Sequence, residues 1–305
     1  MAVDVVSGVE AAPLTVASRG RLARLRELAP FLPAGLLLGV LFFIPLAVMF
    51  IFSLWETNAN LDIVPTWTLN NYGRFFESSA YVRTLTKTVI MGVAVTAICL
   101  VFAFAIAYFL ARYVSRRWAR IALLVVIVPF WTSYLLRVYS WQAILGEKGA
   151  LNQLLMGLGL ISEPSRLFIY NDVGTFIVLT YVYLPFAILV LYASLERFDY
   201  TQLTAAQDLG ASPSRAFRHV LLPQIRPGLI TAAIFVFIPI LGEFLTPSMV
   251  GGASGLLIAN LIQTFFKNAL VPQGAALGLL IVAFVTVLLV IFRKYLRVED
   301  VYVRG

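Results

Sequence analysis

The stretch LTAAQDLGASPSRAFRHVLLP, from Leu203 to Pro223, is a polar interruption between two long apolar segments. It holds an aspartate, two arginines, the one histidine of the chain and a Ser-Pro pair. Short connections between apolar segments rarely carry so many chemically distinct residues. The stretch is therefore expected to have a defined structure of its own.

Local signals in this stretch predict two short helices joined by a sharp turn. Leu203–Leu209 is a good helical run, and Gly210 can end it by adopting a positive φ. Ser212 suits an N-cap, and Pro213 suits the first position of the next helix, where its missing N–H costs nothing. Ser214–Leu222 then continues as a basic amphipathic helix. The sequence predicts a rigid elbow.

The second helix of the elbow has an apolar stripe made of Ala216, Phe217, Val220 and Leu221. Pro223 and Pro227 follow it, and we expect these prolines to stop the helix before the next apolar segment. A stiff elbow of this kind suits the transmission of force between a membrane span and a cytoplasmic partner.

Outside the elbow the chain is too apolar to fold around a single aqueous core. Of its 305 residues, 61% are hydrophobic and 12% are charged, whereas soluble domains are about 45–50% apolar and about 25% charged. The net charge of +8 comes from short basic clusters between apolar runs, which favours topology signals over nucleic-acid binding. The single Cys99 and single His219 leave no cysteine cluster and no histidine-rich metal site.

Six apolar segments approach the length of about 20 residues that a transmembrane helix needs. The expected class is therefore an all-α polytopic membrane protein with six transmembrane helices. The third and fifth segments are the shortest. The predicted spans are Pro33–Leu54, Thr88–Leu110, Ile121–Leu136, Thr175–Leu195, Ile230–Leu245 and Ala275–Phe292.

Basic residues assign the orientation of these spans. Most of the 23 Lys and Arg residues fall on one side, which the positive-inside rule makes cytoplasmic. They lie in Arg19–Arg26, Arg112–Arg120, Arg197–Arg226 and Arg293–Arg304. Both termini and the elbow are therefore expected on the cytoplasmic face, with sizeable outer loops at Glu56–Lys87 and Trp141–Gly174.

The N-terminal basic cluster precedes an apolar run, as in a signal peptide, but that run has the length of a span and no clear cleavage site. An uncleaved first span is expected. RLARLREL, with Leu22, Leu25 and Leu28, predicts an interfacial amphipathic helix. The expected organisation is a cytoplasmic segment 1–30, a six-helix domain 31–293 with a coupling segment 199–223, and a cytoplasmic tail 294–305.

The elbow resembles the cytoplasmic signature of permease subunits of bacterial ATP-binding-cassette importers. That signature is Glu-Ala-Ala, three residues, Gly, nine residues and Ile-x-Leu-Pro. Here Thr204-Ala205-Ala206 precedes Gly210 by the same spacing, and Val220-Leu221-Leu222-Pro223 follows at the same distance. Thr204 replaces the usual glutamate and removes a charge that would face the partner; Val220 for isoleucine is a minor change.

This resemblance implies the importer type I permease fold, with the elbow as a coupling helix seated in a groove of an ATPase subunit. The alternative is a tight helical hairpin whose arginines only meet anionic lipid headgroups. The residues implied in coupling are Thr204, Ala205, Ala206, Asp208, Gly210, Ala211, Ser212, Pro213, Arg215, Phe217, Leu222 and Pro223.

The chain has no G-x-x-x-x-G-K-[ST] pattern, and GGASGLL at 251–257 lacks the lysine. It is therefore expected to bind no cofactor itself, with ATP and Mg²⁺ used by partner subunits. The resemblance implies a second permease, two ATPase subunits and a periplasmic substrate-binding protein as partners, in a bacterial inner membrane and surrounded by its lipid.

Further matching segments are most similar to permeases of the spermidine/putrescine type. These are LNNYGRFF at 69–76, SYLLRVYSWQAILGEKGALNQLL at 133–155 and GEFLTPSMVGG at 242–252. The resemblance favours a small cationic cargo, namely a polyamine such as spermidine or putrescine. Importers of opines and other small organic solutes share these features and remain an alternative.

A pathway for a polycation should offer carboxylates and aromatic faces. Glu243 is the one acid in an otherwise apolar predicted span, and intramembrane acids are costly and often functional. The bland alternatives are an ion pair with Arg137 or a position at the interface. Aromatic candidates are Tyr181, Tyr183, Trp131 and Tyr134, although interfacial aromatic residues commonly serve as membrane anchors.

Two other classes of function compete with an importer permease. An ion-coupled carrier or channel should show several intramembrane acids or paired broken helices, and the elbow would have no use. A membrane enzyme needs convergent catalytic groups, which one histidine and one cysteine do not supply. No catalytic residue is predicted.

Overall fold

The computed structural model describes residues 32–296, and the chain divides into two compact units, Met1–Val48 and Met49–Gly305. Within the first unit the described residues belong to α2 (Leu32–Ser53), an apolar helix that includes Pro45. This helix confirms the first predicted span to within one residue. The predicted segment 1–30 with its amphipathic helix, and residues 297–305 of the predicted tail, lie outside the described residues.

The segment after α2 is folded rather than a simple connector. Strands β1 (Glu56–Thr57) and β2 (Ile63–Val64) form a small antiparallel hairpin in which Glu56 pairs with Val64. Helix α3 (Asn70–Glu77) follows. The Asn71 amide donates to the carbonyls of Ser53 at 2.9 Å and Trp55 at 2.7 Å, and so fixes α3 to the end of α2.

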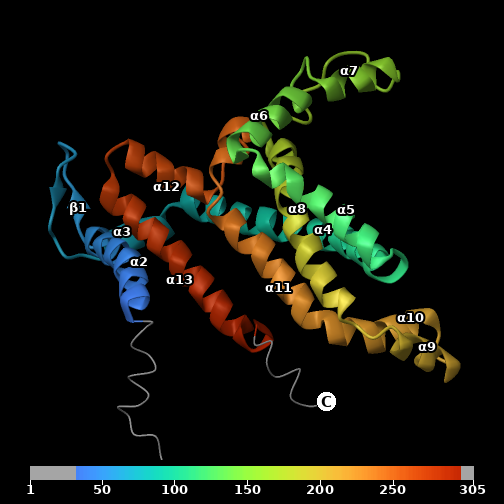
Figure 1. The fold of residues 1–305 in the computed structure, drawn as a ribbon. Helices are drawn as coiled ribbons and strands as arrows, with labels where there is room; N and C mark the ends of the chain where they lie inside the picture. The colour runs from blue at the N-terminus through green and yellow to red at the C-terminus, as the bar shows by residue number, and fades with distance from the viewer. Residues whose placement is uncertain (1–31, 297–305) are drawn as a thin grey trace, which may run out of the picture. The chain divides into compact units, whose positions relative to one another are not determined.

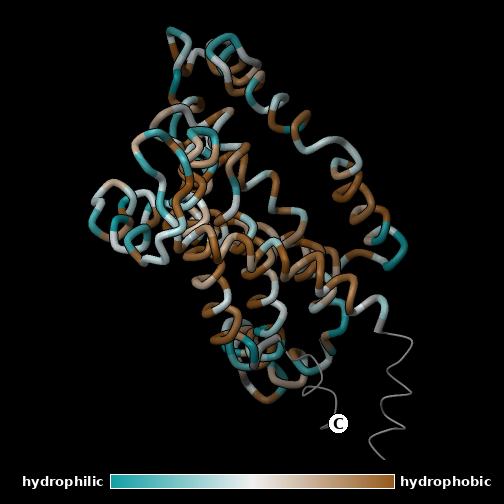
Figure 2. The backbone as a smooth tube through the Cα atoms, turned by 90° about the vertical axis from the view of Figure 1, so that its left-hand side faces the viewer, coloured by the Kyte–Doolittle hydropathy of each residue, from teal (hydrophilic) through white to brown (hydrophobic). Residues whose placement is uncertain are grey.

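The long helices account for most of the predicted spans. Five helices of the described chain are long and apolar enough to cross a membrane. Besides α2 they are α4 (Ser79–Tyr113), α8 (Asp172–Glu196), α11 (Leu222–Leu241) with the turns before it, and α13 (Val271–Leu296). Figure 2 shows hydrophobic residues concentrated along these helices and hydrophilic ones in the loops between them.

Helices α4, α8 and α11 pack against one another and form the main core (Figure 1). Their contact faces carry small residues, so the backbones approach closely, as is common between membrane helices. A Cβ on Gly228 of α11 would lie 2.0 Å from Ser194 Oγ of α8, and one on Gly92 of α4 would lie 2.9 Å from the Phe237 ring. These glycines set the spacing of the three helices.

Gly228→Ala should therefore destabilise the bundle, because the added methyl group overlaps Ser194 and forces α8 and α11 apart. Overpacking of this kind costs about 1–3 kcal/mol, so a clear fall in melting temperature in detergent is expected. Adding Ser194→Gly should restore it. Gly157→Ala is the matched control, since a Cβ there meets nothing within 4 Å; equal melting of both single variants would contradict the packing.

The third predicted span, Ile121–Leu136, is wrong as a single straight helix. Helix α5 (Arg116–Ile127) passes through a 3-10 turn, η2 (Val128–Trp131), and the chain then bends by 93° into α6 (Tyr134–Leu145). Pro129 supplies no N–H to continue the helix, and the backbone after η2 is extended at Thr132. Counting this bent pair as one span gives six membrane spans.

The fifth predicted span, Ile230–Leu245, has both ends in the wrong place, because the helix starts earlier and stops at Leu241. The expectation that Pro223 and Pro227 stop the elbow helix is also wrong. Helix α10 (Pro213–Ala216) continues through a π-helical turn, η3 (Phe217–Leu221), into α11.

A proline ring normally clashes with the carbonyl four residues before it. At η3 the Leu222 N–H bonds to the Phe217 carbonyl, five residues back. This wider turn gives the following Pro223 ring more room than an α-helical turn would. The elbow and the fifth span are therefore joined without a break.

Two shorter helices were not predicted. One lies in the segment expected to be an outer loop, and the other lies in a segment for which no element was predicted. Helix α7 (Ala150–Gly157) follows α6, and Trp141 belongs to α6 instead of starting a loop. Helix α12 (Ile258–Lys267) precedes α13 and packs against it. Thr88 Oγ1 accepts the Ile258 N–H at 2.8 Å, which fixes the start of α12 to α4.

Candidate functional site: a rigid elbow and a buried carboxylate

The elbow has the predicted helix–turn–helix form. Helix α9 (Thr201–Asp208) ends in a Schellman motif: the Gly210 N–H bonds to Gln207 O at 2.9 Å and the Ala211 N–H bonds to Ala206 O at 3.0 Å. Gly210 has φ +91°, a backbone conformation that residues other than glycine adopt only with strain. These two bonds satisfy helix-end carbonyls and make the turn rigid.

The second arm of the elbow begins as the sequence predicts. Ser212 is the N-cap of α10 and its Oγ accepts the Arg215 N–H at 3.3 Å, with Pro213 at the first helical position. The predicted apolar stripe faces inward, where Ala216 and Leu221 are buried. A hydrogen bond of 2.6 Å from Gln224 to Gln202 ties the start of α11 to α9.

An aromatic cluster fixes the elbow to the end of α4. The Phe217 ring packs edge-on against Phe104 at 5.7 Å, and the Tyr200 ring packs against Tyr108 at 6.1 Å. The guanidinium of Arg112 lies 5.3 Å from the Tyr200 ring centroid, within cation–π range. Burial raises the pKa of Tyr200 to about 12.

The structure divides the predicted coupling residues into two sets. Ala206, Ala211 and Phe217 are half-buried, and Phe217 faces α4 rather than solvent. The others are exposed: Thr204, Ala205, Asp208, Gly210, Ser212, Pro213, Arg215, Leu222 and Pro223. Exposed residues therefore lie on both sides of the turn at Gly210.

Leu209 is the residue of the elbow that sequence reasoning missed. It is 90% exposed at the tip, beside a glycine whose Cβ position has nothing within 4 Å. The signature leaves the residue type at this position unspecified, so the sequence alone assigns Leu209 no role. A large apolar side chain held out by a rigid turn is costly in water and suits insertion into a partner.

Glu243 lies at the junction of three helical elements. It is 8% exposed and both carboxylate oxygens are engaged. Oε2 accepts hydrogen bonds from the hydroxyls of Tyr134 at 2.7 Å and Tyr183 at 3.2 Å. Oε1 accepts the N–H groups of Leu245 at 3.0 Å and Thr246 at 3.2 Å. Four donors therefore surround one carboxylate and link α6, α8 and the chain after α11.

The expectation that Glu243 lies within the helix of the fifth span is wrong. It occupies the break between the end of α11 and the π-helical turn η4 (Pro247–Gly251). Its carboxylate caps the N–H groups that such a break leaves free. Within residues 32–296 it forms no ion pair with Arg137, so that alternative is not what the structure shows.

Two of the aromatic pathway candidates, Trp131 and Tyr181, do not contact Glu243. Trp131 is 87% exposed, as expected of a membrane anchor. Tyr181 is half-buried and its ring packs against Trp141 at 5.1 Å. Of the four aromatic candidates, Tyr134 and Tyr183 meet the carboxylate. Thr246 is fully buried and shares a 2.6 Å hydrogen bond with the Tyr134 hydroxyl. The sequence suggested that Thr246 marks a bend or helix end, but it did not predict this contact.

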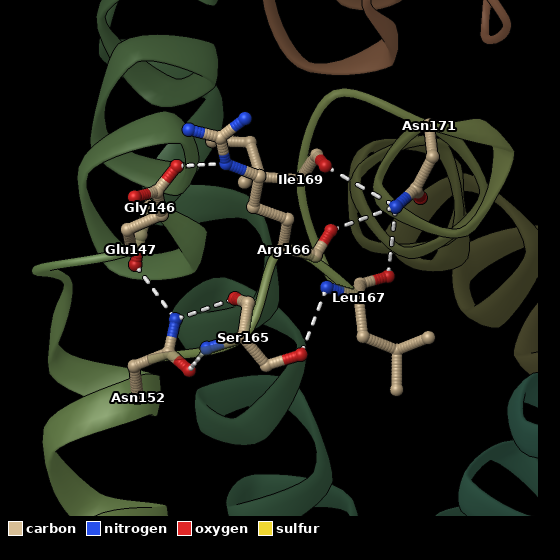
Figure 3. Close-up of polar contacts among 8 residues, drawn as sticks. All are labelled: Gly146, Glu147, Asn152, Ser165, Arg166, Leu167, Ile169 and Asn171. Carbon is tan, nitrogen blue, oxygen red and sulfur yellow. Dashed lines mark hydrogen bonds and ion pairs between the residues drawn. The ribbon is translucent and has the colours of Figure 1, made fainter. Parts of the chain in front are cut away.

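Asparagine side chains hold the segment from α7 to the start of α8 in shape (Figure 3). The Asn152 amide donates to Gly146 O and Ser165 O at 3.0 and 2.9 Å. Asn171 caps α8 by accepting the Gly174 N–H, and its amide donates to three loop carbonyls. The Tyr170 N–H then bonds to Val250 O of η4 at 2.6 Å, so the loop between α7 and α8 is connected to the turn that follows Glu243.

Known proteins with related sequences include transport permeases. The family model described as "Binding-protein-dependent transport system inner membrane component" matches residues 103–297. The spermidine/putrescine transport system permease protein PotB of Salmonella typhimurium is 35% identical over 232 residues, covering 76% of this chain and 80% of the relative. The inner membrane ABC transporter permease protein YdcU of Escherichia coli is 34% identical, covering 67% and 68%.

Among solved structures, a bacterial ABC transporter involved in the import of the acidic polysaccharide alginate has a similar chain. The TM-score is 0.72 with 15% identity, covering 91% of this chain and 98% of that one. At that identity the likeness concerns the fold, which is the all-α importer-permease fold expected from the sequence. The chain belongs to the family of binding-protein-dependent transport system inner membrane components and is a multi-pass inner-membrane permease subunit of an ABC importer.

Proposed function

We propose that this permease forms half of the pathway by which an ATP-driven importer brings a polyamine into the cell. ATP is hydrolysed by two separate ATPase subunits, one of which seats the elbow in a groove. A second, similar permease completes the pathway, and a periplasmic binding protein delivers the cargo. The observation that carries this proposal is the rigid elbow with Leu209 fully presented at its tip.

The elbow has the properties that mechanical coupling requires. Its turn is fixed by the Schellman bonds of Gly210 and Ala211, and its second arm continues without a break into α11. Its first arm follows α8, which is part of the main core. A force applied at Leu209 is therefore transmitted to two spans. A flexible connector would absorb such a force instead.

The basic clusters support placing the elbow on the cytoplasmic face, with both termini on the same side. Arg112, Arg215 and Arg218 all lie at the elbow end of the long helices. Figure 1 shows α9 and α10 at the end of α8 opposite to α6 and α7. This arrangement supports an outer position for α7 and its loop.

The outer loop offers a surface for the periplasmic binding protein. Leu154, Leu158 and Leu160 are exposed there, and the asparagine network holds the loop in shape. A similar structure forms a complex with a periplasmic protein bound to an alginate pentasaccharide, which supports the same kind of partner for this fold.

The polyamine assignment is supported by the PotB relatives and by the chemistry of the Glu243 region. A carboxylate surrounded by tyrosines suits a flexible polycation, because carboxylates pair with ammonium groups and aromatic faces attract cations. Opines, which carry carboxylates of their own, fit less well with this region.

The cargo is tested with the complete importer in vesicles that hold ATP. Labelled spermidine and putrescine should accumulate in the presence of the binding protein, and a labelled opine should not. Uptake of the opine in place of either polyamine would overturn the cargo and leave the importer assignment intact.

Gly210→Asp should separate the permease from its ATPase. An aspartate at φ +91° strains the turn by about 1–3 kcal/mol, and it places a charge beside Leu209. We expect the variant to reach the membrane but to retain little ATPase in a pull-down. Gly159→Asp is the matched control, because Gly159 also has a positive φ (+68°) and open space around it. Equal ATPase recovery from both variants would contradict the docking role.

A further inference from the structure

Arg137, in the first turn of α6, is a half-buried cation that forms no ion pair within residues 32–296. Its Nε is buried without a hydrogen-bond partner there. Other cations pair with carboxylates: Arg74 with Glu56, Lys87 with Asp172 and Arg166 with Glu147. A partly buried charge without such a partner is costly, so a different interaction must hold Arg137 in place.

Two aromatic rings supply that interaction. The Arg137 guanidinium carbon lies 4.7 Å from the centroid of Phe130 and 5.5 Å from that of Tyr134. Both distances fall within the range of cation–π attraction. Phe186 packs edge-on against Phe130 at 4.7 Å and is itself exposed on one side. Arg137 thus occupies a half-open aromatic face.

Glu243 makes this face attractive to cations. The Tyr134 ring under Arg137 carries the hydroxyl that donates to Glu243 Oε2 at 2.7 Å. Donation to a carboxylate pushes electron density into the phenol ring, which strengthens its attraction for a cation. Glu243 and Thr246 both bond to this hydroxyl, so the carboxylate lies behind the ring and its negative charge adds to the attraction of the ring face for an ammonium group.

We propose that the face formed by the Phe130 and Tyr134 rings, with the Glu243 carboxylate behind Tyr134, is a binding subsite for a primary ammonium group of the cargo, and that Arg137 occupies it as a tethered competitor when cargo is absent. This rests on the proposed polyamine function. The cargo displaces the guanidinium on arrival, and Arg137 returns as the cargo moves on. A resident competitor keeps the site weak, which a transport pathway needs because cargo must leave as well as enter.

The first test measures binding of labelled spermidine to the assembled permease and ATPase complex in nanodiscs, without binding protein. Arg137→Gln and Arg137→Met remove the competing cation and should bind spermidine about tenfold more tightly, as expected for the loss of a cation–π competitor. Arg137→Lys keeps a cation and should stay near the original affinity. Weaker binding in the two cation-free variants, or affinity equal to that of Arg137→Lys, would overturn the proposal.

The second test uses the unaltered chain, so it does not depend on how any variant folds. Phenylglyoxal modifies accessible arginines, and mass spectrometry of the peptide that contains Arg137 reports the rate. Saturating spermidine should raise that rate several-fold, because the guanidinium leaves the rings. Protection of Arg137, or no change, would contradict displacement.

Uptake by the complete importer separates this proposal from the proposed function. Suppose that the unaltered importer accumulates spermidine while the Arg137 variants keep the original affinity and spermidine leaves the modification rate of Arg137 unchanged. In that case only the competitor role fails. If it accumulates no polyamine at all, the proposed cargo fails, and the ammonium subsite fails with it.

Discussion

Replacing Leu209 by aspartate should abolish ATP-driven uptake while the permease remains folded in the membrane. Leu209 is 90% exposed, so the fold loses no contact when it is changed. In a partner groove, a buried leucine contributes about 1.5–3 kcal/mol, and an unpaired aspartate there adds a further penalty. The affinity of the permease for the ATPase subunit should fall by about tenfold to a hundredfold.

Leu69→Asp is the matched control for this variant. Leu69 is 68% exposed and is the N-cap residue of α3, a position where aspartate is favourable. ATPase recovery in a pull-down and uptake in vesicles should both fall for Leu209→Asp and stay unchanged for Leu69→Asp. If the Leu209 variant retained both activities, the elbow tip would not be the point of attachment.

The second large effect is expected at Glu243, where two substitutions separate charge from structure. Glu243→Ala leaves two backbone N–H groups and the hydroxyls of Tyr134 and Tyr183 without their acceptor. Each unsatisfied buried donor costs about 1–3 kcal/mol, so this variant should be lost from the membrane or melt well below the original protein.

Glu243→Gln keeps a carbonyl oxygen for the N–H groups of Leu245 and Thr246 but removes the charge. It should therefore be much more stable than Glu243→Ala, while polyamine uptake falls by at least about tenfold because the ammonium loses its counter-charge. Glu77→Gln, a change at an acid elsewhere on the chain, should leave uptake unchanged. Uptake and melting temperature both unchanged in Glu243→Gln would show that the carboxylate has no part in the pathway.

The sequence predicts the elbow well because its signals are local. Gly210 and Ser212 act on the backbone within three or four residues, so their turn and cap follow from residue type. The exposure of Leu209 is also a local consequence of that turn, but the motif gives no reason to single it out. The residue can be recognised only when its surroundings are known.

The misplaced span ends have a different cause. Apolar composition continues through Pro129 and beyond Leu241, so hydropathy cannot detect the bend after η2 or the break that holds Glu243. Pro223 has the opposite effect: it predicts a helix end, but the π-helical turn at η3 accommodates it. Backbone hydrogen bonds decide these positions, and hydropathy does not report them.

The Glu243 region depends on contacts that are remote in sequence. Tyr134 and Tyr183 lie 109 and 60 residues from Glu243, and only the packing of α6 and α8 brings their hydroxyls to one oxygen. Arg137 was expected as a possible ion-pair partner of Glu243, yet it lies on the rings of Phe130 and Tyr134. Residue type suggested a charge pair, and the fold separates the two charges by a tyrosine.

The central claim is that energy from separate ATPase subunits reaches the pathway through the elbow. The most direct test compares labelled spermidine uptake into vesicles that contain the permease pair with ATPase subunits and ATP, with the pair alone, and with no protein. Uptake should require the ATPase subunits and ATP, and the pair alone should match empty vesicles. Full-rate uptake by the permease pair alone would contradict the account.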